Sequence, residues 1–311
     1  MRAYRTIGVE PLTATIGARV EGPDLTRPLP PEQTAEIRDA LLRHLVLFFR
    51  AHELSEEQQL AFATQFGSPM SASIMDREAH ESGDGLFVVL EDTPDSPPKA
   101  DRWHTDVPFV EEPPNIAVLC MLATPAVGGD TLWSSLYAAY ESLSPVARRV
   151  IAHLEVDVGL GASAATIREL YGEAYYRRVM DDFRSVRHPL VRVHPETGRP
   201  ALYLSGSFME GIAGMSPQES ELLLGFLQAR LDDPNVQCRW KWEQHDVVMW
   251  DERCTNHRAV SDHYPAHRMI RRVLVGRGAP IPQSGSESAD QGRDELVGEG
   301  VETGPARQIR P

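Results

Sequence analysis

The pattern of apolar and polar residues along the chain predicts many short β-strands. Some are continuous apolar runs, as at 46–49, and others alternate, as at 236–242. The predicted strands lie at residues 14–20, 46–49, 86–90, 116–122, 236–242, 247–250 and 272–275. The regular strand–helix alternation of a doubly wound parallel sheet does not occur. The pattern therefore favours a mainly β (α+β) fold, with a sandwich or barrel core and helices packed outside it.

Four segments carry helical periodicity or helix start signals. Ser55 and Ser216 each stand three residues before a Gln or Glu, which is the pattern of a capping box. Ser144 precedes a proline that suits the first position of a helix. The predicted helices cover residues 31–45, Ser55 to Gly67, a segment from Ser144, and Ser216 to about Leu231. Two less regular stretches, 68–79 and 159–187, are candidate lids.

Length and composition allow one large folded domain. The chain has 311 residues, of which 41% are hydrophobic, enough to build a single core. From Ala279 onward Pro, Gly, Ser and Glu dominate, so this stretch buries too little apolar area to offset the entropy of ordering. We predict one domain over residues 1–278 and a disordered tail over 279–311.

The charge and the cysteines restrict the partners and the cell compartment. A net charge of -14 repels phosphates, so we expect no nucleic acid and no membrane partner. The expected partners are a small-molecule substrate and further copies of the chain, in a homo-oligomer that is a dimer or a tetramer. Cys120, Cys238 and Cys254 lack the close spacing of a disulfide framework or a structural zinc site. Residues 1–10 carry no apolar signal core, and no run approaches the roughly 18–20 apolar residues of a membrane span. We therefore expect a cytoplasmic protein.

A histidine and an aspartate two residues apart, His104 and Asp106, are the most informative chemical feature of the chain. In an extended segment, residues i and i+2 point to the same side, so both side chains can face one ion. The distant His257 would complete the set. Two imidazoles and one carboxylate bind one face of Fe(II) and leave the other face open for dioxygen. Since such a triplet also occurs by chance, it does not by itself establish a metal site.

Four segments, in the same order, resemble the taurine and alkylsulfatase branch of the Fe(II)/2-oxoglutarate-dependent dioxygenases. This TauD/TfdA family also includes the dichlorophenoxyacetate enzymes. The matching segments are Trp103–Phe109, Gly128–Trp133, His188–Pro195 and Val248–Ala259, followed by Arg268 and Arg272. The resemblance extends from Ile7 to Gly278 and implies a double-stranded β-helix (jelly-roll) core with iron near one mouth.

The resemblance also implies a role for individual residues. The two histidines and the aspartate named above match the iron ligands. Thr131 matches the hydroxyl that meets the distal carboxylate of 2-oxoglutarate, and Arg268 matches the arginine that pairs with this carboxylate through its planar fork. Arg272 matches a second arginine, near the substrate anion and the cosubstrate, although a strand-edge salt bridge is the alternative. The implied reaction uses Fe(II), 2-oxoglutarate and O2, releases succinate and CO2, and hydroxylates a C–H bond of a small organic substrate.

The expected substrate region departs from the taurine pattern. Ala72, Met75 and Ala100 stand near positions where taurine-type members carry polar side chains that hold the sulfonate, and none of them can donate such a hydrogen bond. Met75, Phe109 and Phe208 are candidate lining residues, with ordinary core packing as the alternative. We expect taurine to be a poor substrate. Alkyl sulfates, larger sulfonates, aryloxyalkanoates or an intermediate of specialised metabolism fit better.

Two other functions stay open at this point. A zinc metallohydrolase could use the same three ligands with a metal-activated water, but it would need neither Thr131 nor Arg268. A non-catalytic binding domain could use the same jelly-roll scaffold, since a fold does not determine a function. The three intact ligand positions weigh against this second alternative.

Overall fold

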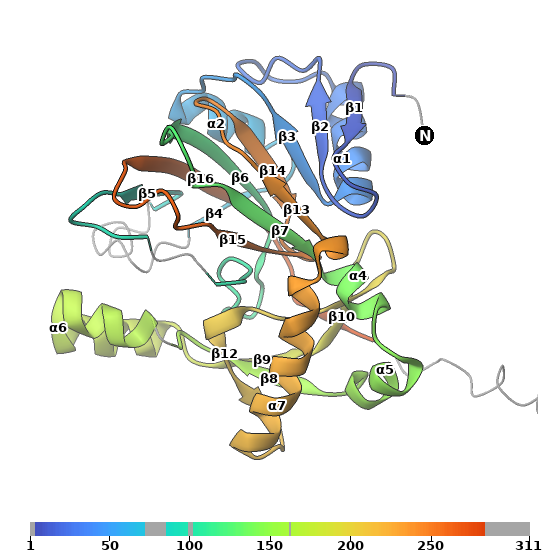
Figure 1. The fold of residues 1–311 in the computed structure, drawn as a ribbon, viewed down its shortest axis with the longest axis vertical. Helices are drawn as coiled ribbons and strands as arrows, with labels where there is room; N and C mark the ends of the chain where they lie inside the picture. Colours follow the sequence, from blue (N-terminus) through green and yellow to red (C-terminus); the bar gives the residue numbers. More distant parts are fainter. Residues whose placement is uncertain (1–3, 72–84, 99–101, 162, 284–311) are drawn as a thin grey trace, which may run out of the picture.

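The structure is a computed structural model that describes residues 4–71, 85–98, 102–161 and 163–283. Helices cover the outside of several β-sheets (Figure 1). The α-helices are α1 (Pro31–His44), α2 (Glu56–Ala63), α4 (Leu136–Glu141), α5 (Pro145–Ile151), α6 (Ser163–Asp182) and α7 (Pro217–Gln228). The 3-10 helices are η1 (Gly206–Phe208), η2 (Ala229–Asp232) and η3 (Pro234–Val236). Among these described helices, none is both long and apolar enough to cross a membrane.

An eight-stranded sheet forms the upper part of the molecule in Figure 1. Its order is β1-β2-β3-β14-β6-β16-β4, and β5 also pairs with β16. The strands are β1 (Gly8–Pro11), β2 (Ala18–Glu21), β3 (Val46–Phe49), β4 (Pro69–Met70), β5 (Phe87–Asp92), β6 (Pro114–Ala123), β14 (Val247–Asp251) and β16 (Arg268–Arg277). β2 and β3 run parallel, and the neighbouring pairs in the rest of the sheet are antiparallel.

Alternate residues of this sheet enter two different hydrophobic cores, because successive strand side chains point to opposite faces. In β3, Phe49 packs against Phe62 of α2, with ring centroids 5.8 Å apart. Phe48, one residue earlier, belongs to the core on the other face. β16 follows the same rule, since Ile270 joins the core of Phe48 whereas Val273 joins the core under α1 and α2.

A smaller sheet covers the face that carries Phe48. Its antiparallel order is β13-β7-β15, formed by β13 (Gln237–Trp240), β7 (Thr131–Ser135) and β15 (Thr255–Ala259). The Phe48 ring stacks on Trp240 at 4.2 Å between centroids and meets the edge of Trp133 at 5.4 Å. Two facing sheets with helices outside confirm the predicted fold class.

Two further three-stranded sheets lie below these, among α4 to α7 (Figure 1). One has the order β12-β8-β9 and the other β11-β10-β17. Their strands are β8 (Glu155–Val158), β9 (Val186–Pro189), β10 (Val191–Val193), β11 (Pro200–Leu202), β12 (Met209–Ile212) and β17 (Ile281–Pro282). α6, the helix in the irregular stretch at 159–187, projects to one side in Figure 1, and Gly172 interrupts it with φ 79°.

The predicted strands and helices are present, but several boundaries differ. The strand predicted at 14–20 is present only from Ala18, as β2, because the backbone amide of Leu12 donates to Gly17 O at 2.9 Å and closes the turn that joins β1 to β2. β16 begins at Arg268, four residues earlier than predicted, because its arginines replace apolar residues in the pattern. β7 and β15 were not predicted, since their sequences are largely polar.

The folded chain also extends beyond the boundary predicted at residue 278. Ile281 and Pro282 pair with β10, and the Gln283 side chain accepts a hydrogen bond from Tyr140 at 3.2 Å. The edge of β10 therefore orders Ile281 and Pro282, although the composition of this part of the chain predicted disorder. The remaining tail from 284 and most of the candidate lid at 68–79 lie outside the described residues.

The sandwiched aromatic ring gives a test of the fold. Replacing Phe48 by Ala removes the side chain between the two sheets, so we expect the free energy of unfolding to fall by about 3–5 kcal/mol. Urea unfolding followed by tryptophan fluorescence measures this loss. Leu222→Ala is the control, because Leu222 is 77% exposed on α7 and should change stability by at most about 0.5 kcal/mol. Equal losses in both variants would contradict the assigned packing.

Candidate metal centre

The two predicted histidine ligands are joined through their backbones. The amide of His104 donates to His257 O at 3.0 Å, and the amide of His257 donates to His104 O at 2.8 Å. In an antiparallel sheet, such a mutually bonded pair places both side chains on the same face. The two imidazole rings are accordingly neighbours, with centroids 4.2 Å apart. β15 thus carries the distant histidine to the segment of His104.

Asp106 completes the cluster. Its Oδ1 atom lies 3.8 Å from Nε2 of His104 and 4.0 Å from Nε2 of His257. One ligand atom from each of the three residues lies within 4.8 Å of the others. The structure therefore brings together the set that the motif and its distant partner predicted.

The donor atoms of this cluster fit a divalent metal. Nδ1 of His104 lies 2.8 Å from the carbonyl oxygen of Arg102, which holds the proton on Nδ1 and leaves the Nε2 lone pair free to coordinate. Oδ2 of Asp106 is buried without a hydrogen-bond partner among the described residues. A buried carboxylate oxygen costs free energy when it has no partner, and a coordinated cation would remove that cost.

Charge around the cluster sets the protonation states that a metal needs. Burial opposes ionisation of Asp106, but Arg272, His257 and His104 outweigh it and lower the pKa of this carboxyl to about 2. Burial, together with His104, lowers the pKa of His257 to about 3, so its imidazole is neutral at pH 7. An ionised carboxylate and a neutral imidazole are the forms that bind metal.

Arg272 contacts the ligand set directly. Its NH1 nitrogen donates to Oδ1 of Asp106, and its side chain is only 12% exposed. Nε of Arg272 is buried without a partner among the described residues. Because this Nε atom has no partner among the described residues, a ligand with a negative group could bind the guanidinium there.

The cosubstrate residues predicted from the sequence also meet. Arg268 starts β16 and donates from Nε to Gly129 O at 3.0 Å and from NH2 to Thr131 Oγ1 at 3.4 Å. The Thr131 hydroxyl also accepts from Trp242 Nε1 at 3.0 Å. Gly129 has φ +72°, and a Cβ atom there would lie 3.1 Å from Cδ of Arg268. The Gly-Gly-Asp-Thr motif therefore has glycine where the arginine crosses the backbone.

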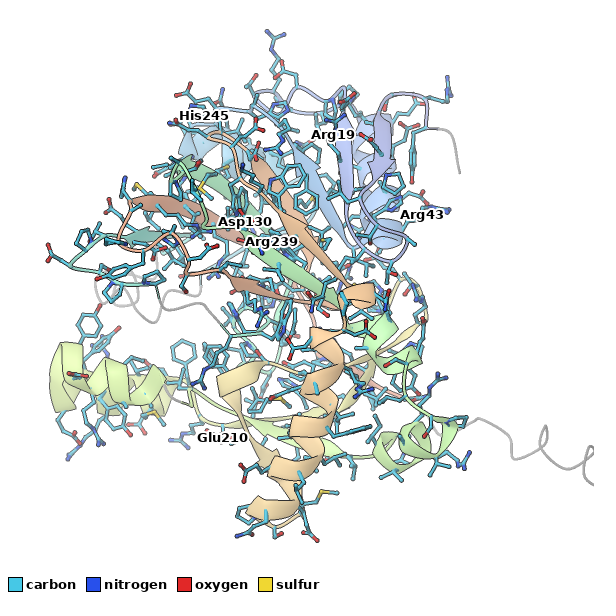
Figure 2. The ribbon with its side chains drawn as sticks, viewed as in Figure 1. Arg19, Arg43, Asp130, Glu210, Arg239 and His245 are labelled. Atoms are coloured by element: carbon cyan, nitrogen blue, oxygen red, sulfur yellow. The ribbon has the colours of Figure 1, made fainter. Side chains whose placement is uncertain are left out.

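The arginine is fixed from its other side by a residue that the sequence did not indicate. Asp92, at the end of β5, lies 3.7 Å from NH1 of Arg268 and 3.2 Å from Nε2 of His263. Asp130, next to Thr131, faces elsewhere and binds Arg239 at 2.6 Å, as Figure 2 shows for this labelled pair. β16 places Arg268 and Arg272 on the same face, because their positions in the strand differ by four, an even number.

Glu252 is a second residue that the sequence reasoning missed. It follows β14 directly and is 1% exposed. Its Oε2 accepts from Thr105 Oγ1 at 2.6 Å and from the backbone amide of Asp106 at 3.1 Å. Burial and the negative charge of Asp106 raise the pKa of this carboxyl well above its usual value. No local pattern marks it, because the acidic residue directly after the apolar run 247–250 is Asp251, and the partners of Glu252 lie far away in the chain.

The predicted substrate-lining residues form part of an aromatic group. Phe109 is 3% exposed, and its ring centroid lies 5.4 Å from Phe208 and 5.6 Å from Phe183. Phe208 is half-buried against the same core. These contacts show core packing, and a role in substrate binding stays a prediction. Met75 lies outside the described residues, as do Ala72 and Ala100.

A second group of potential ligands, His194, Asp251 and Cys254, does not fit a metal. The guanidinium of Arg253 donates to both oxygens of Asp251 at 2.9 and 2.7 Å, and His194 contacts one of them at 3.0 Å. Burial raises the pKa of the Cys254 thiol well above its usual value, so no thiolate is available. Hydrogen bonds already satisfy this carboxylate, which makes the group structural.

Comparison with known proteins gives a consistent result. The family model for "Taurine catabolism dioxygenase TauD, TfdA family" matches residues 8–274. An alkylsulfatase of Acinetobacter baylyi is 36% identical over 269 residues, which cover 85% of this chain and 83% of that protein. An alpha-ketoglutarate-dependent sulfate ester dioxygenase of Pseudomonas putida is 34% identical over 290 residues, covering 91% and 93%. The crystal structure of AAD-2 with Mn(II) and N-oxalylglycine has a TM-score of 0.75 at 30% identity, covering 89% of this chain and all of that one.

The closeness of η1 to the ligand segment gives a test of this geometry. Gly206 has φ +42°, and a Cβ atom there would overlap the carbonyl oxygen of Trp103, next to His104. We expect Gly206→Ala to lower the free energy of unfolding by more than about 1 kcal/mol and to weaken Mn(II) binding, measured by urea unfolding and titration calorimetry. Gly214→Ala is the matched control, because Gly214 has φ +82° but no atom within 4 Å of its Cβ position. Unchanged Mn(II) affinity in Gly206→Ala would contradict the close contact.

Proposed function

Because the chain belongs to the taurine catabolism dioxygenase TauD, TfdA family, and is thus an Fe(II)- and 2-oxoglutarate-dependent dioxygenase, we propose a residue for each step of its work. His104, Asp106 and His257 would hold Fe(II). Thr131 and Arg268 would bind the distal carboxylate of 2-oxoglutarate. When bound, iron and 2-oxoglutarate supply the oxidising chemistry with dioxygen, and they leave succinate and CO2 as products.

One observation carries this assignment: a buried arginine reaches the Thr131 hydroxyl from the strand that also reaches the metal ligands. Arg268 is 4% exposed and Arg272, on the same face of β16, binds Asp106. Four positions along a strand place the Cα atoms of Arg268 and Arg272 roughly 13 Å apart. The two long side chains and a dicarboxylate between them can bridge this distance. A buried guanidinium placed in this way suits an anion that also reaches the metal.

The residues of the chain would bind and orient the reactants. The Arg268 fork and the Thr131 hydroxyl would set the direction of the cosubstrate, since two charged hydrogen bonds define an axis. Trp133 and Trp250 pack against the His257 ring, at 6.5 and 4.9 Å between centroids, and exclude water from that side. The open side of the three ligands is left for the reactants.

We propose a substrate that is bulkier and more apolar than taurine and that carries one anionic group, held by Arg272. The Nε atom of Arg272, which has no partner among the described residues, supports an anion there. The aromatic group of Phe109 and Phe208 supports an apolar body. Relatives named as an alkylsulfatase and a sulfate ester dioxygenase favour an alkyl sulfate. The homo-oligomer and the cytoplasmic location predicted from the sequence stay predictions.

Arg268 distinguishes this function from that of a zinc hydrolase, because only the dioxygenase needs it to bind 2-oxoglutarate. Removing the guanidinium in Arg268→Ala should weaken 2-oxoglutarate binding roughly 10- to 100-fold, because each charged hydrogen bond contributes about 1.5–3 kcal/mol. Titration calorimetry of the Mn(II)-loaded protein measures this affinity. Arg271→Lys is the control, because Arg271 lies on the opposite face of β16 and binds Gln59. A variant Arg268→Ala that still binds 2-oxoglutarate normally would refute the assignment.

The substrate proposal makes a second prediction. Succinate formation with a medium-chain alkyl sulfate should exceed that with taurine by at least about tenfold, because each buried methylene adds apolar contact that taurine lacks. Succinate is measured directly, with sulfate or sulfite release as the coupled product. Efficient sulfite release from taurine would overturn the proposal.

A further inference from the structure

A buried acid stands directly behind the carboxylate ligand. Glu252 accepts hydrogen bonds at both side-chain oxygens, from Trp250 Nε1 at 2.7 Å on Oε1 and from Thr105 and Asp106 on Oε2. The described residues place no arginine, lysine or histidine in an ion pair with it. The nearby Arg192 donates to the backbone oxygen of Glu252 at 2.6 Å instead.

Such a residue is costly for a role in packing alone. A carboxyl group that leaves water loses its hydration, and neutral donors recover only part of it. An apolar side chain of similar volume would fill this space at a lower cost in free energy. The arrangement is therefore better explained by what the three hydrogen bonds hold in place.

Two of these three hydrogen bonds hold the segment that carries the proposed ligands His104 and Asp106. Thr105, the middle residue of the motif, is 3% exposed and turned away from the ligand cluster, with its hydroxyl on Glu252. From the other side, Ser205 accepts from the Thr105 amide and donates to the Thr105 carbonyl oxygen, both at 3.1 Å. The Asp106 amide is held by Glu252 itself.

We call the hydrogen bonds of Glu252 to Thr105 and to the Asp106 amide the clamp. Arg272 explains why such a clamp is needed. Its guanidinium binds Oδ1 of Asp106, the oxygen that also faces the two histidines. An arginine in this place competes with a metal ion for the same carboxylate. A fixed backbone on the far side limits how far the carboxylate can move toward Arg272.

We propose that Glu252, acting through Thr105 and the Asp106 amide, is a positioning residue that sets the affinity of the site for a divalent metal. This inference rests on the proposed function, since it assumes that His104, Asp106 and His257 hold the ion. Hydrogen-bond partners outside a metal's ligand set commonly change its affinity 10- to 100-fold, because they fix the orientation of the ligands.

Two variants test the clamp by titration calorimetry of the metal-free full chain with Mn(II). Thr105→Val keeps the volume and removes the hydroxyl, and Glu252→Gln keeps the volume and replaces one accepting oxygen by an NH2 group. We expect each to weaken Mn(II) binding about tenfold. Thr105→Ser restores the hydroxyl and should bind within about twofold of the unaltered chain. Thermal unfolding without metal should shift to lower temperature in Thr105→Val, because the buried Glu252 loses one donor, and the control variant below separates that loss of stability from a loss of Mn(II) affinity.

Gln59→Leu is the matched control, because Gln59 is also fully buried and donates to Val118 O and Arg271 O at 3.0 Å, away from the metal ligands. It should lose stability but keep its Mn(II) affinity. Failure of the unaltered chain to bind Mn(II) would refute the proposed function. Binding that is unchanged in Thr105→Val and Glu252→Gln, or equally weakened in Gln59→Leu, would overturn the clamp while leaving that function in place.

Discussion

The reciprocal backbone hydrogen bonds between His104 and His257 are the constraint on which the site depends. They join a loop segment to β15, and they fix which faces of both residues meet. The third ligand follows from the first, because it lies two residues further along the same segment. Main-chain pairing therefore brings the two candidate histidine ligands together, and the side-chain hydrogen bonds of Glu252 act on the segment that this pairing has already placed.

The two sheets supply the rigid frame around this pairing. The small sheet holds β15 beside β7, so His257 lies opposite Trp133 in the register. The large sheet brings β16 across the same core, with Arg272 next to Asp106. Since the core between the sheets is filled by rings such as Phe48 and Trp240, the distance between them is set by packing. The candidate site is consequently a product of the whole fold, although its residues come from four short segments.

The sequence predicted the apolar strands and the capped helices, because each of these leaves a local pattern. The cluster of His104, Asp106 and His257 was indicated by the H-x-D spacing and by the family resemblance, and the structure brings these side chains together. The strand Val46–Phe49 and the helix from Pro31 were found almost to the residue. β7 and β15 were missed, since the residues that would have shown an apolar alternation there are Thr131, Ser134 and His257. Asp92 and Glu252 were missed for a different reason: they act on residues far away in the chain, and single-sequence patterns do not record such pairs. The strand at Ile281 was missed because its partner edge, not its own composition, orders it.

The alternation along β16 has a consequence for how this protein could change over time. On one face of the strand, Arg268 and Arg272 lie at the candidate site, and Ile270 and Leu274 join the core of Phe48. On the other face, Arg271, Val273 and Val275 anchor the strand to α2 and the core under α1 and α2. Selection can thus act on one side of the strand for a new ligand while the other side preserves foldability. In this ten-residue strand, residues that can change with the ligand and residues that stabilise the fold lie on opposite faces. This arrangement suits a scaffold whose relatives include enzymes named for different substrates.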